Sequence, residues 1–244
     1  MKIYIIAHKM VDFPVLSDIY KPLQVGTALH ERLEGNWAYD DEGENISDKN
    51  LSYNELTGLY WMWKNSREDI VGLCHYRRYF VAASGKVQNL LFGKQNHFLQ
   101  EEDIRKALEH HDMIVHNKTF FKEGCGQQFQ RTQKHPEDLD LLRKVIKKEY
   151  PEYQKAFERV FSGKTCHLLN VMIARKEILD SYCSWLFSVL EKVETELIER
   201  GETDFSRRLG MIGERLLDVW IVQNQIRIKE CFMINTERND WKPW

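Results

Sequence analysis

The chain has 244 residues, of which 43% are hydrophobic and 30% are charged, and its formal net charge is −2. This length and composition fit a soluble globular protein with a sizeable core, and they exclude a disordered or fibrous chain. The near-neutral charge provides no basic surface of the kind that nucleic-acid-binding proteins carry, so no nucleic-acid partner is expected.

Neither cysteines nor apolar segments point to export. The five cysteines are odd in number, widely spaced and without a CxxC pair, which favours reduced thiols in a cytoplasm over disulfides or a zinc site. The apolar run at residues 2–7 is too short for a signal peptide or a membrane span. We therefore expect a cytoplasmic protein whose only membrane contact is peripheral.

Two short apolar runs in the first half predict buried strands that end in polar side chains. Residues 2–7 are followed by His8 and Lys9, and residues 70–74 are followed by the cluster HYRRY at 75–79. Ligands of open α/β sheets bind beyond the carboxyl ends of the strands. The two polar clusters are therefore candidates for a shared ligand site.

The segment between these strands predicts a loop followed by a helix. Residues 40–50 are acidic and rich in Gly and Asn, whereas residues 51–65 carry apolar side chains at helical spacing, with Asn50 as a possible N-cap. Polar side chains at the start of a helix are suited to hydrogen-bonding a ribose, a base or a sugar. The candidates are Asn45, Ser47, Asn50, Asn54 and Glu55, although Asn50 could equally serve only as a cap.

The remainder of the chain predicts mostly helices. Helices are expected over 101–111, over two stretches of 136–161 broken at Pro151, and over 176–199 and 205–223; strands over 112–116, 166–174 and part of 226–244; and a long loop over 119–135. Strands that alternate with helices in the first half indicate an α/β fold with a mainly parallel central sheet, and the C-terminal half is expected to be rich in helices.

Adjacent arginines after a strand are suited to binding phosphate. Arg77 and Arg78 carry permanent charge and can bind phosphate oxygens in a bidentate way, but successive residues of an extended chain face opposite sides. We therefore expect one of the two to face the ligand, with His75 as a hydrogen-bonding neighbour. The alternatives are an ion-paired edge and a core histidine. Because this segment contains no carboxylate and no second ligand near His75, no metal site is predicted.

Residues 204–217 predict a helix with two glycines in it. Gly210 and Gly213 weaken a helix by about 1 kcal/mol each relative to alanine, so they suggest close approach of a neighbour or a ligand. A carboxylate here could act as a general base. Glu214 is the first candidate and Asp204 the second, while an amphipathic surface helix with ordinary charge pairs is the alternative.

Six segments resemble a known family along almost the whole chain. They are IIAHK (5–9), YKPLQVG (20–26), DDEGENISDKNLSYNELTGLYWMWKN (40–65), IVGLCHYRRYF (70–80), NVMIARKEILDSYCSWLF (170–187) and RLGMIGERLLDVW (208–220). The family comprises small glycosyltransferases of capsular polysaccharide synthesis, grouped under a domain of unknown function that includes bacterial β-1,3-galactofuranosyltransferases. The resemblance implies a single GT-A-like nucleotide-sugar-binding domain, with a donor half at 1–118 and an acceptor half at 119–244.

The same resemblance implies the reaction and the roles of the candidate residues. A sugar, galactofuranose in the first place, would move from a UDP donor to a lipid-linked oligosaccharide at the inner face of the plasma membrane, with inversion. The donor would be held by His8, Lys9, the 45–55 segment, Tyr76, Arg77, Arg78, Asn170 and Arg208. The catalytic residues would be Glu214 or Asp204 as the base and His75, which helps the arginines to hold the departing diphosphate. Where GT-A enzymes carry a metal-binding Asp-x-Asp, this chain has His75-Tyr76-Arg77, so no metal ion or other cofactor is assigned.

Three alternatives remain open at this stage. The donor could be a UDP-hexopyranose instead. The chain could also be a non-catalytic subunit of a polysaccharide assembly complex, recruiting partners through its aromatic tail at 232–244. A glycoside hydrolase would require two carboxylates that face one cleft.

Overall fold

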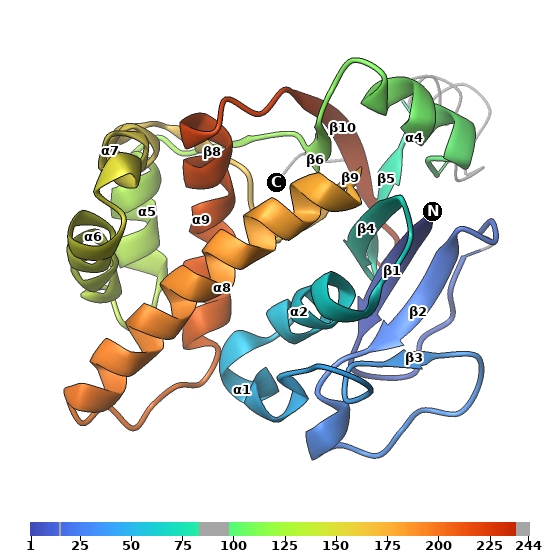
Figure 1. The fold of residues 1–244 in the computed structure, drawn as a ribbon, viewed down its shortest axis with the longest axis horizontal. Helices are drawn as coiled ribbons and strands as arrows, with labels where there is room; N and C mark the ends of the chain where they lie inside the picture. The colour runs from blue at the N-terminus through green and yellow to red at the C-terminus, as the bar shows by residue number, and fades with distance from the viewer. Residues whose placement is uncertain (15, 83–97, 238–244) are drawn as a thin grey trace.

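The computed structural model of the protein describes residues 1–14, 16–82 and 98–237 (Figure 1). Its main sheet has eight strands in the order β3-β2-β1-β4-β5-β10-β6-β9, with a further pairing of β4 with β9. The strands are β1 (Lys2–Ala7), β2 (Tyr20–Gln24), β3 (Ala38–Tyr39), β4 (Ile70–His75), β5 (Arg78–Val81), β6 (Met113–His116), β9 (Met172–Arg175) and β10 (Ile228–Asn235). The short strands β7 (Thr119–Phe120) and β8 (Thr165–Cys166) form a separate pair.

The fold is α/β, as predicted, but the sheet is mixed rather than mainly parallel. The pairs β1–β2, β1–β4, β2–β3 and β6–β10 are parallel, whereas β4–β5, β4–β9, β6–β9 and β5–β10 are antiparallel. The antiparallel pairs have two local causes. The chain turns back on itself directly after β4, and β9 enters the sheet from the opposite edge. Apolar runs reveal where strands are but not their direction.

The helices lie in two groups (Figure 1). Helices α1 (Asn50–Tyr53) and α2 (Leu56–Asn65) lie beside the first strands, and α4 (Glu101–Leu108) lies near β6. The second group contains α5 (Cys125–Thr132), α6 (Asp138–Glu149) and α7 (Gln154–Ser162), followed by α8 (Lys176–Glu199) and α9 (Arg208–Gln223). In Figure 1, α5, α6 and α7 gather at the end of the molecule away from β2 and β3, while α8 runs diagonally across the front.

Three local expectations require correction. The helix expected over 51–65 is broken at Asn54, whose φ of 51° lies in the left-handed region. The strand expected over 166–174 is interrupted by Leu169 and Asn170, also with positive φ. The segment 119–135 is not simply a loop, because it contains β7 and α5. Sequence periodicity misses such short elements, since tertiary contacts rather than local preference stabilise them.

The strand expected after residue 226 is present as β10, and residues 238–244 of the aromatic tail lie outside the described residues. No helix in the described ranges is long and apolar enough to cross a bilayer.

Candidate functional site

One edge of the main sheet collects polar side chains from several strands. β4 is parallel to β1, and it is related to β6 through the antiparallel β9, so the carboxyl ends of β1, β4 and β6 share this edge. Met172 of β9 pairs with both Leu73 and Val115, which places Asn170, two residues earlier, beyond the same edge. His8, His75 and His116 therefore stand at the ends of neighbouring strands.

An aromatic and cationic cluster forms around Tyr76. The buried Tyr76 ring lies edge-on to His8 at 5.7 Å and close to His75 at 4.2 Å between ring centroids. Lys9 Nζ lies 5.4 Å from the same ring, and the Arg77 guanidinium carbon lies 5.6 Å from it. The polar residues that follow β1 and β4 thus meet in space.

Burial and neighbouring cations keep the two histidines of this cluster uncharged near neutral pH. Burial, reinforced by the positive charges of Arg78 and Arg77, lowers the pKa of His75 to about 3. Burial and then the charge of Lys9 lower the pKa of His8 below its usual value. The positive charge at this edge therefore comes from lysine and arginine, and the histidines offer neutral hydrogen-bonding groups.

The two adjacent arginines have different surroundings. Arg77 lies in the turn after β4, and its guanidinium donates to Glu237 Oε2 at 3.1 Å. Arg78 begins β5; burial raises the pKa of both Glu55 and Glu214, and the charge of Arg78 opposes that rise in each. Arg78 is therefore the arginine near the carboxylates.

Glu55 and Glu214 form a half-buried carboxylate pair. Burial, and then the negative charge of Glu55, raise the pKa of Glu214 to about 7. Burial likewise raises the pKa of Glu55, against the hydrogen bond that Asn170 Nδ2 donates to Glu55 Oε1 at 3.0 Å. Two acids that share one site titrate together, so the pair is partly protonated near neutral pH. Such a group is suited to acid–base chemistry.

Glycines of α9 allow the two carboxylates to approach. A Cβ at Gly210 would lie 2.6 Å from Asn54 Nδ2 and 3.0 Å from the Tyr53 carbonyl oxygen, and one at Gly213 would lie 2.6 Å from Leu56 Cδ1. The close neighbour of these glycines is thus the junction between α1 and α2. Since Glu55 lies in this junction and Glu214 follows Gly213, tight helix packing creates the pair.

The segment that carries Asn170 is anchored from two sides by residues that the sequence did not single out. Asp218 accepts the backbone N–H of His167 at 2.7 Å, and its other oxygen contacts the His167 ring. Leu168 N–H donates to the His116 ring at 2.7 Å. These anchors hold Leu169 and Asn170 in left-handed conformations, with φ of 74° and 46°.

Three of the polar candidates before α2 are engaged within their own loop. Ser47 is buried, and its hydroxyl donates to Asp40 at 2.5 Å. Asn45 Nδ2 donates to the Asp41 and Gly43 carbonyls. Asn50 does not cap the helix through its side chain, because Nδ2 donates to the Asn54 carbonyl and to the Thr57 hydroxyl.

Asp204 and Arg208 also have partners away from the carboxylate pair. Asp204 pairs with Lys134 and His135, and the hydrogen bond from Lys134 contributes most to lowering its pKa to about 2. Arg208 is buried and donates three hydrogen bonds of 2.7, 2.9 and 3.1 Å to Asp138. Asp204 is thus a weak base, and Arg208 ties α9 to α6.

The end of β4 does not fit a divalent cation. His75 is followed by an aromatic ring and two arginines, which repel a cation and supply no carboxylate oxygen. Across the ranges that the structure describes, no three His, Cys, Asp or Glu side chains form a group that could hold a metal ion.

Comparisons with known proteins agree with this fold. The structure is similar, with a TM-score of 0.81 and 29% sequence identity, to one described as "WbbM bifunctional glycosytransferase apo structure". The match covers 97% of this chain but only 45% of that one, so the chain spans less than half of its relative. A comparison with the curated proteins gives no match. Residues 2–225 match the model of the family described as "Domain of unknown function (DUF4422)", and the chain therefore belongs to that family.

Proposed function

We propose that this protein is a glycosyltransferase that moves a sugar, galactofuranose in the first place, from a UDP donor to an oligosaccharide acceptor. The observation that carries the proposal is the Glu55–Glu214 pair beside Arg78, at the carboxyl edge of the sheet. A base poised near neutral pH and a fixed cation are the two groups that such a transfer requires. The likeness to part of a bifunctional glycosyltransferase supports the proposal.

The chemistry follows from these charges. Glu214 accepts the proton of the acceptor hydroxyl while the oxygen attacks the anomeric carbon. The bond from that carbon to the diphosphate oxygen breaks, and its electron pair leaves with UDP. Arg78 and Lys9 stabilise the negative charge that develops on UDP, and His75 and Tyr76 hold the diphosphate by hydrogen bonds. Attack from the face opposite UDP inverts the anomeric configuration.

Residue roles in substrate binding are part of the same proposal. Residues 1–118 bind the donor, and residues 119–244 shape the acceptor site. Asn170 orients Glu55, whose charge adds to burial in keeping the pKa of Glu214 high. The acceptor is a lipid-linked oligosaccharide of a capsular or related surface polysaccharide, which places the protein at the inner face of the plasma membrane.

Calorimetric titration with UDP, with and without EDTA, tests the donor site. We expect binding that survives EDTA and weakens at least tenfold in Arg78→Ala. Arg77→Ala should weaken it less, because Arg77 already pairs with Glu237. Arg131→Ala, which removes an exposed ion pair with Glu123, is the control. Absence of UDP binding by the wild type would contradict the proposal and favour a non-catalytic assembly subunit.

A donor panel tests the sugar. UDP-galactofuranose should give faster turnover than UDP-galactose or UDP-glucose, measured as UDP release in the presence of acceptor. NMR of the product then reports the anomeric configuration. A preference for a UDP-hexopyranose would leave the proposed transferase activity standing and change only its donor. A product with retained anomeric configuration would exclude direct displacement.

The carboxylate pair also favours a second candidate, a glycoside hydrolase. Such enzymes use two carboxyl groups, one as acid and the other as base or nucleophile. The cations around Tyr76 argue for an anionic leaving group instead. Cleavage of a glycan in the absence of any nucleotide, abolished in Glu214→Gln, would favour the hydrolase.

A further inference from the structure

A cavity of about 330 Å³ lies between the end of α5, the segment after it and the start of α9. Its floor is apolar, formed by Phe129, Met211 and Ile212, and its rim is polar, with Gln133 and Arg207 among its residues. An apolar surface with a few polar groups around it is typical of small-ligand sites, and this volume is at the lower end of their range.

The cavity adjoins the carboxylate pair. Arg207 lines the cavity, and its positive charge also opposes the rise that burial causes in the pKa of both Glu55 and Glu214. Met211 and Glu214 are three residues apart on α9, so their side chains share one face of the helix. The wall formed by Arg207 and Met211 therefore continues to Glu214.

Most charges around the cavity are already paired, and Arg207 is the exception. Arg208 binds Asp138, and Lys134 binds Asp204. Arg207 is exposed, and its guanidinium has no hydrogen-bond partner among the residues that the structure describes. Its backbone is held in place, because its N–H donates to the Leu51 carbonyl at 2.7 Å while φ is 61°. A fixed backbone thus presents a donor group to the cavity.

We propose that this cavity binds the terminal sugar ring of the acceptor, with its attacking hydroxyl directed at Glu214. The inference rests on the proposed glycosyltransferase function and locates the acceptor within it. Met211 packs against the C–H face of the ring, and Arg207 and Gln133 donate hydrogen bonds to its hydroxyls. The donor lies on the other side of the carboxylate pair, near Tyr76 and Arg78.

The inference is tested by measuring whether simple acceptors stimulate UDP release. The acceptors are the octyl β-glycosides of galactose, glucose, N-acetylglucosamine and rhamnose. For wild type we expect at least one glycoside to raise UDP release above the rate with water alone. Met211→Trp fills the floor of the cavity and should raise the half-saturating glycoside concentration at least tenfold. Gln133→Trp fills it from the segment after α5, outside α9, and should act in the same direction.

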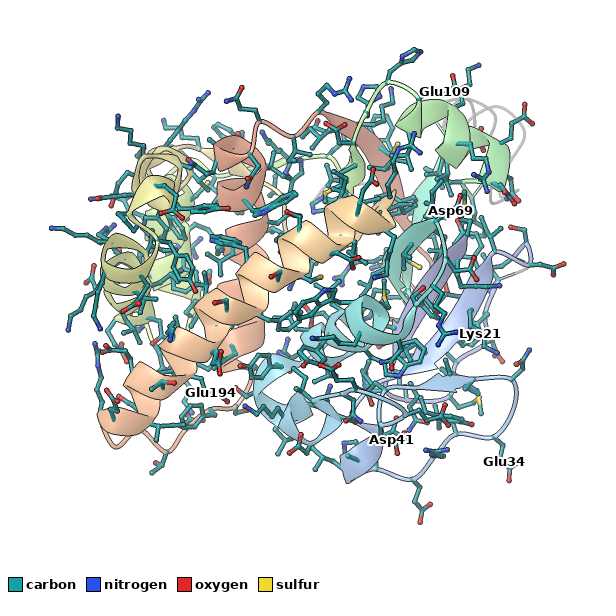
Figure 2. All side chains as sticks on the ribbon, in the orientation of Figure 1. Lys21, Glu34, Asp41, Asp69, Glu109 and Glu194 are labelled. Atoms are coloured by element: carbon teal, nitrogen blue, oxygen red, sulfur yellow. The ribbon has the colours of Figure 1, made fainter. Side chains whose placement is uncertain are left out.

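Ser184→Trp is the matched control. It places a tryptophan in a different cavity of about 300 Å³, between α2 and α8, which Trp63, Phe187 and Glu194 also line. Figure 2 shows Glu194 on α8, close to α1. Ser184→Trp should leave the half-saturating glycoside concentration unchanged.

The possible outcomes separate the two proposals. Wild-type protein that neither binds nor turns over UDP-sugars contradicts the proposed function. Intact UDP binding with unchanged half-saturation in both Met211→Trp and Gln133→Trp contradicts only the acceptor cavity. An equal effect of Ser184→Trp, or donor turnover that none of the four glycosides stimulates, also counts against the cavity.

Discussion

Replacing Glu214 by glutamine should stabilise the protein at alkaline pH while strongly lowering turnover. Burial and the charge of Glu55 raise the pKa of Glu214 from 4.5 to about 7. One pKa unit corresponds to roughly 1.4 kcal/mol, so ionising Glu214 in the folded protein costs about 3 kcal/mol more than in the unfolded chain. Glutamine has nearly the same shape and carries no charge, so it avoids this cost.

The pH dependence follows from the direction of the shift. The folded protein binds the proton of Glu214 more tightly than the unfolded chain does, so this group favours folding below pH 4.5. That advantage is lost as the pH rises to about 7. The free energy of unfolding of Glu214→Gln should therefore equal that of wild type near pH 4.5 and exceed it above pH 7, by up to about 3 kcal/mol.

Urea unfolding at pH 5 and pH 8 measures this difference, and UDP release with acceptor measures turnover. Loss of a general base should lower kcat by roughly 10² to 10⁴. Glu109→Gln is the control, because Glu109 is exposed at the end of α4 (Figure 2). Equal stability changes at the two pH values, or destabilisation of Glu214→Gln at pH 8, would refute the reasoning.

Three further predictions concern the surroundings of the site. Arg208→Ala should lower the free energy of unfolding by about 3–5 kcal/mol because Asp138 is left buried and unpaired, and adding Asp138→Leu should recover most of this loss. Gly210→Ala should destabilise by roughly 1–3 kcal/mol, since its Cβ would lie 3.0 Å from the Tyr53 carbonyl oxygen, and lower kcat more than UDP affinity. Because the pKa of His75 is about 3, His75→Gln should change UDP affinity by the same factor at pH 5 and pH 8, and a loss only at pH 5 would contradict this.

Elements with a long or strongly apolar pattern could be predicted from the sequence. The strand at residues 2–7 and the helix at residues 176–199 have the bounds that the apolar pattern indicates. In both, burial of one continuous apolar run or face decides the structure, and the sequence displays that pattern directly. The helices before and after Pro151 could be predicted from their apolar faces in the same way.

The carboxylate pair could not be predicted from local patterns. Glu55 and Glu214 were both candidates, one for donor binding and the other as base, but no pattern relates two residues so distant in the chain. Their proximity depends on the break at Asn54 and on the contact of Gly210 with that break. The glycines were the available signal, because they indicated a close neighbour without identifying it.

Backbone strain is concentrated around the carboxylate pair. Among the described residues, five non-glycine residues have positive φ, and four of them surround this site: Asn54, Leu169, Asn170 and Arg207. Each such conformation costs of order 1–3 kcal/mol, and it persists only where surrounding contacts enforce it. The hydrogen bonds that Asn170 Nδ2 donates to Glu55 and that the Arg207 N–H donates to the Leu51 carbonyl are such contacts.

The same place also holds two half-buried acids, one of which ionises at a cost of about 3 kcal/mol. Replacing the residues with strained backbone by glycine, or the two acids by glutamine, would in each case lower the free energy of the folded protein. Costs of two unrelated kinds, in the backbone and in the charges, thus coincide within one small region. Selection for stability alone would remove both, whereas a site that requires a base near neutral pH and fixed donors beside it would retain them. The coincidence therefore supports, independently of any likeness to other proteins, the roles proposed above for Glu55, Glu214 and Asn170.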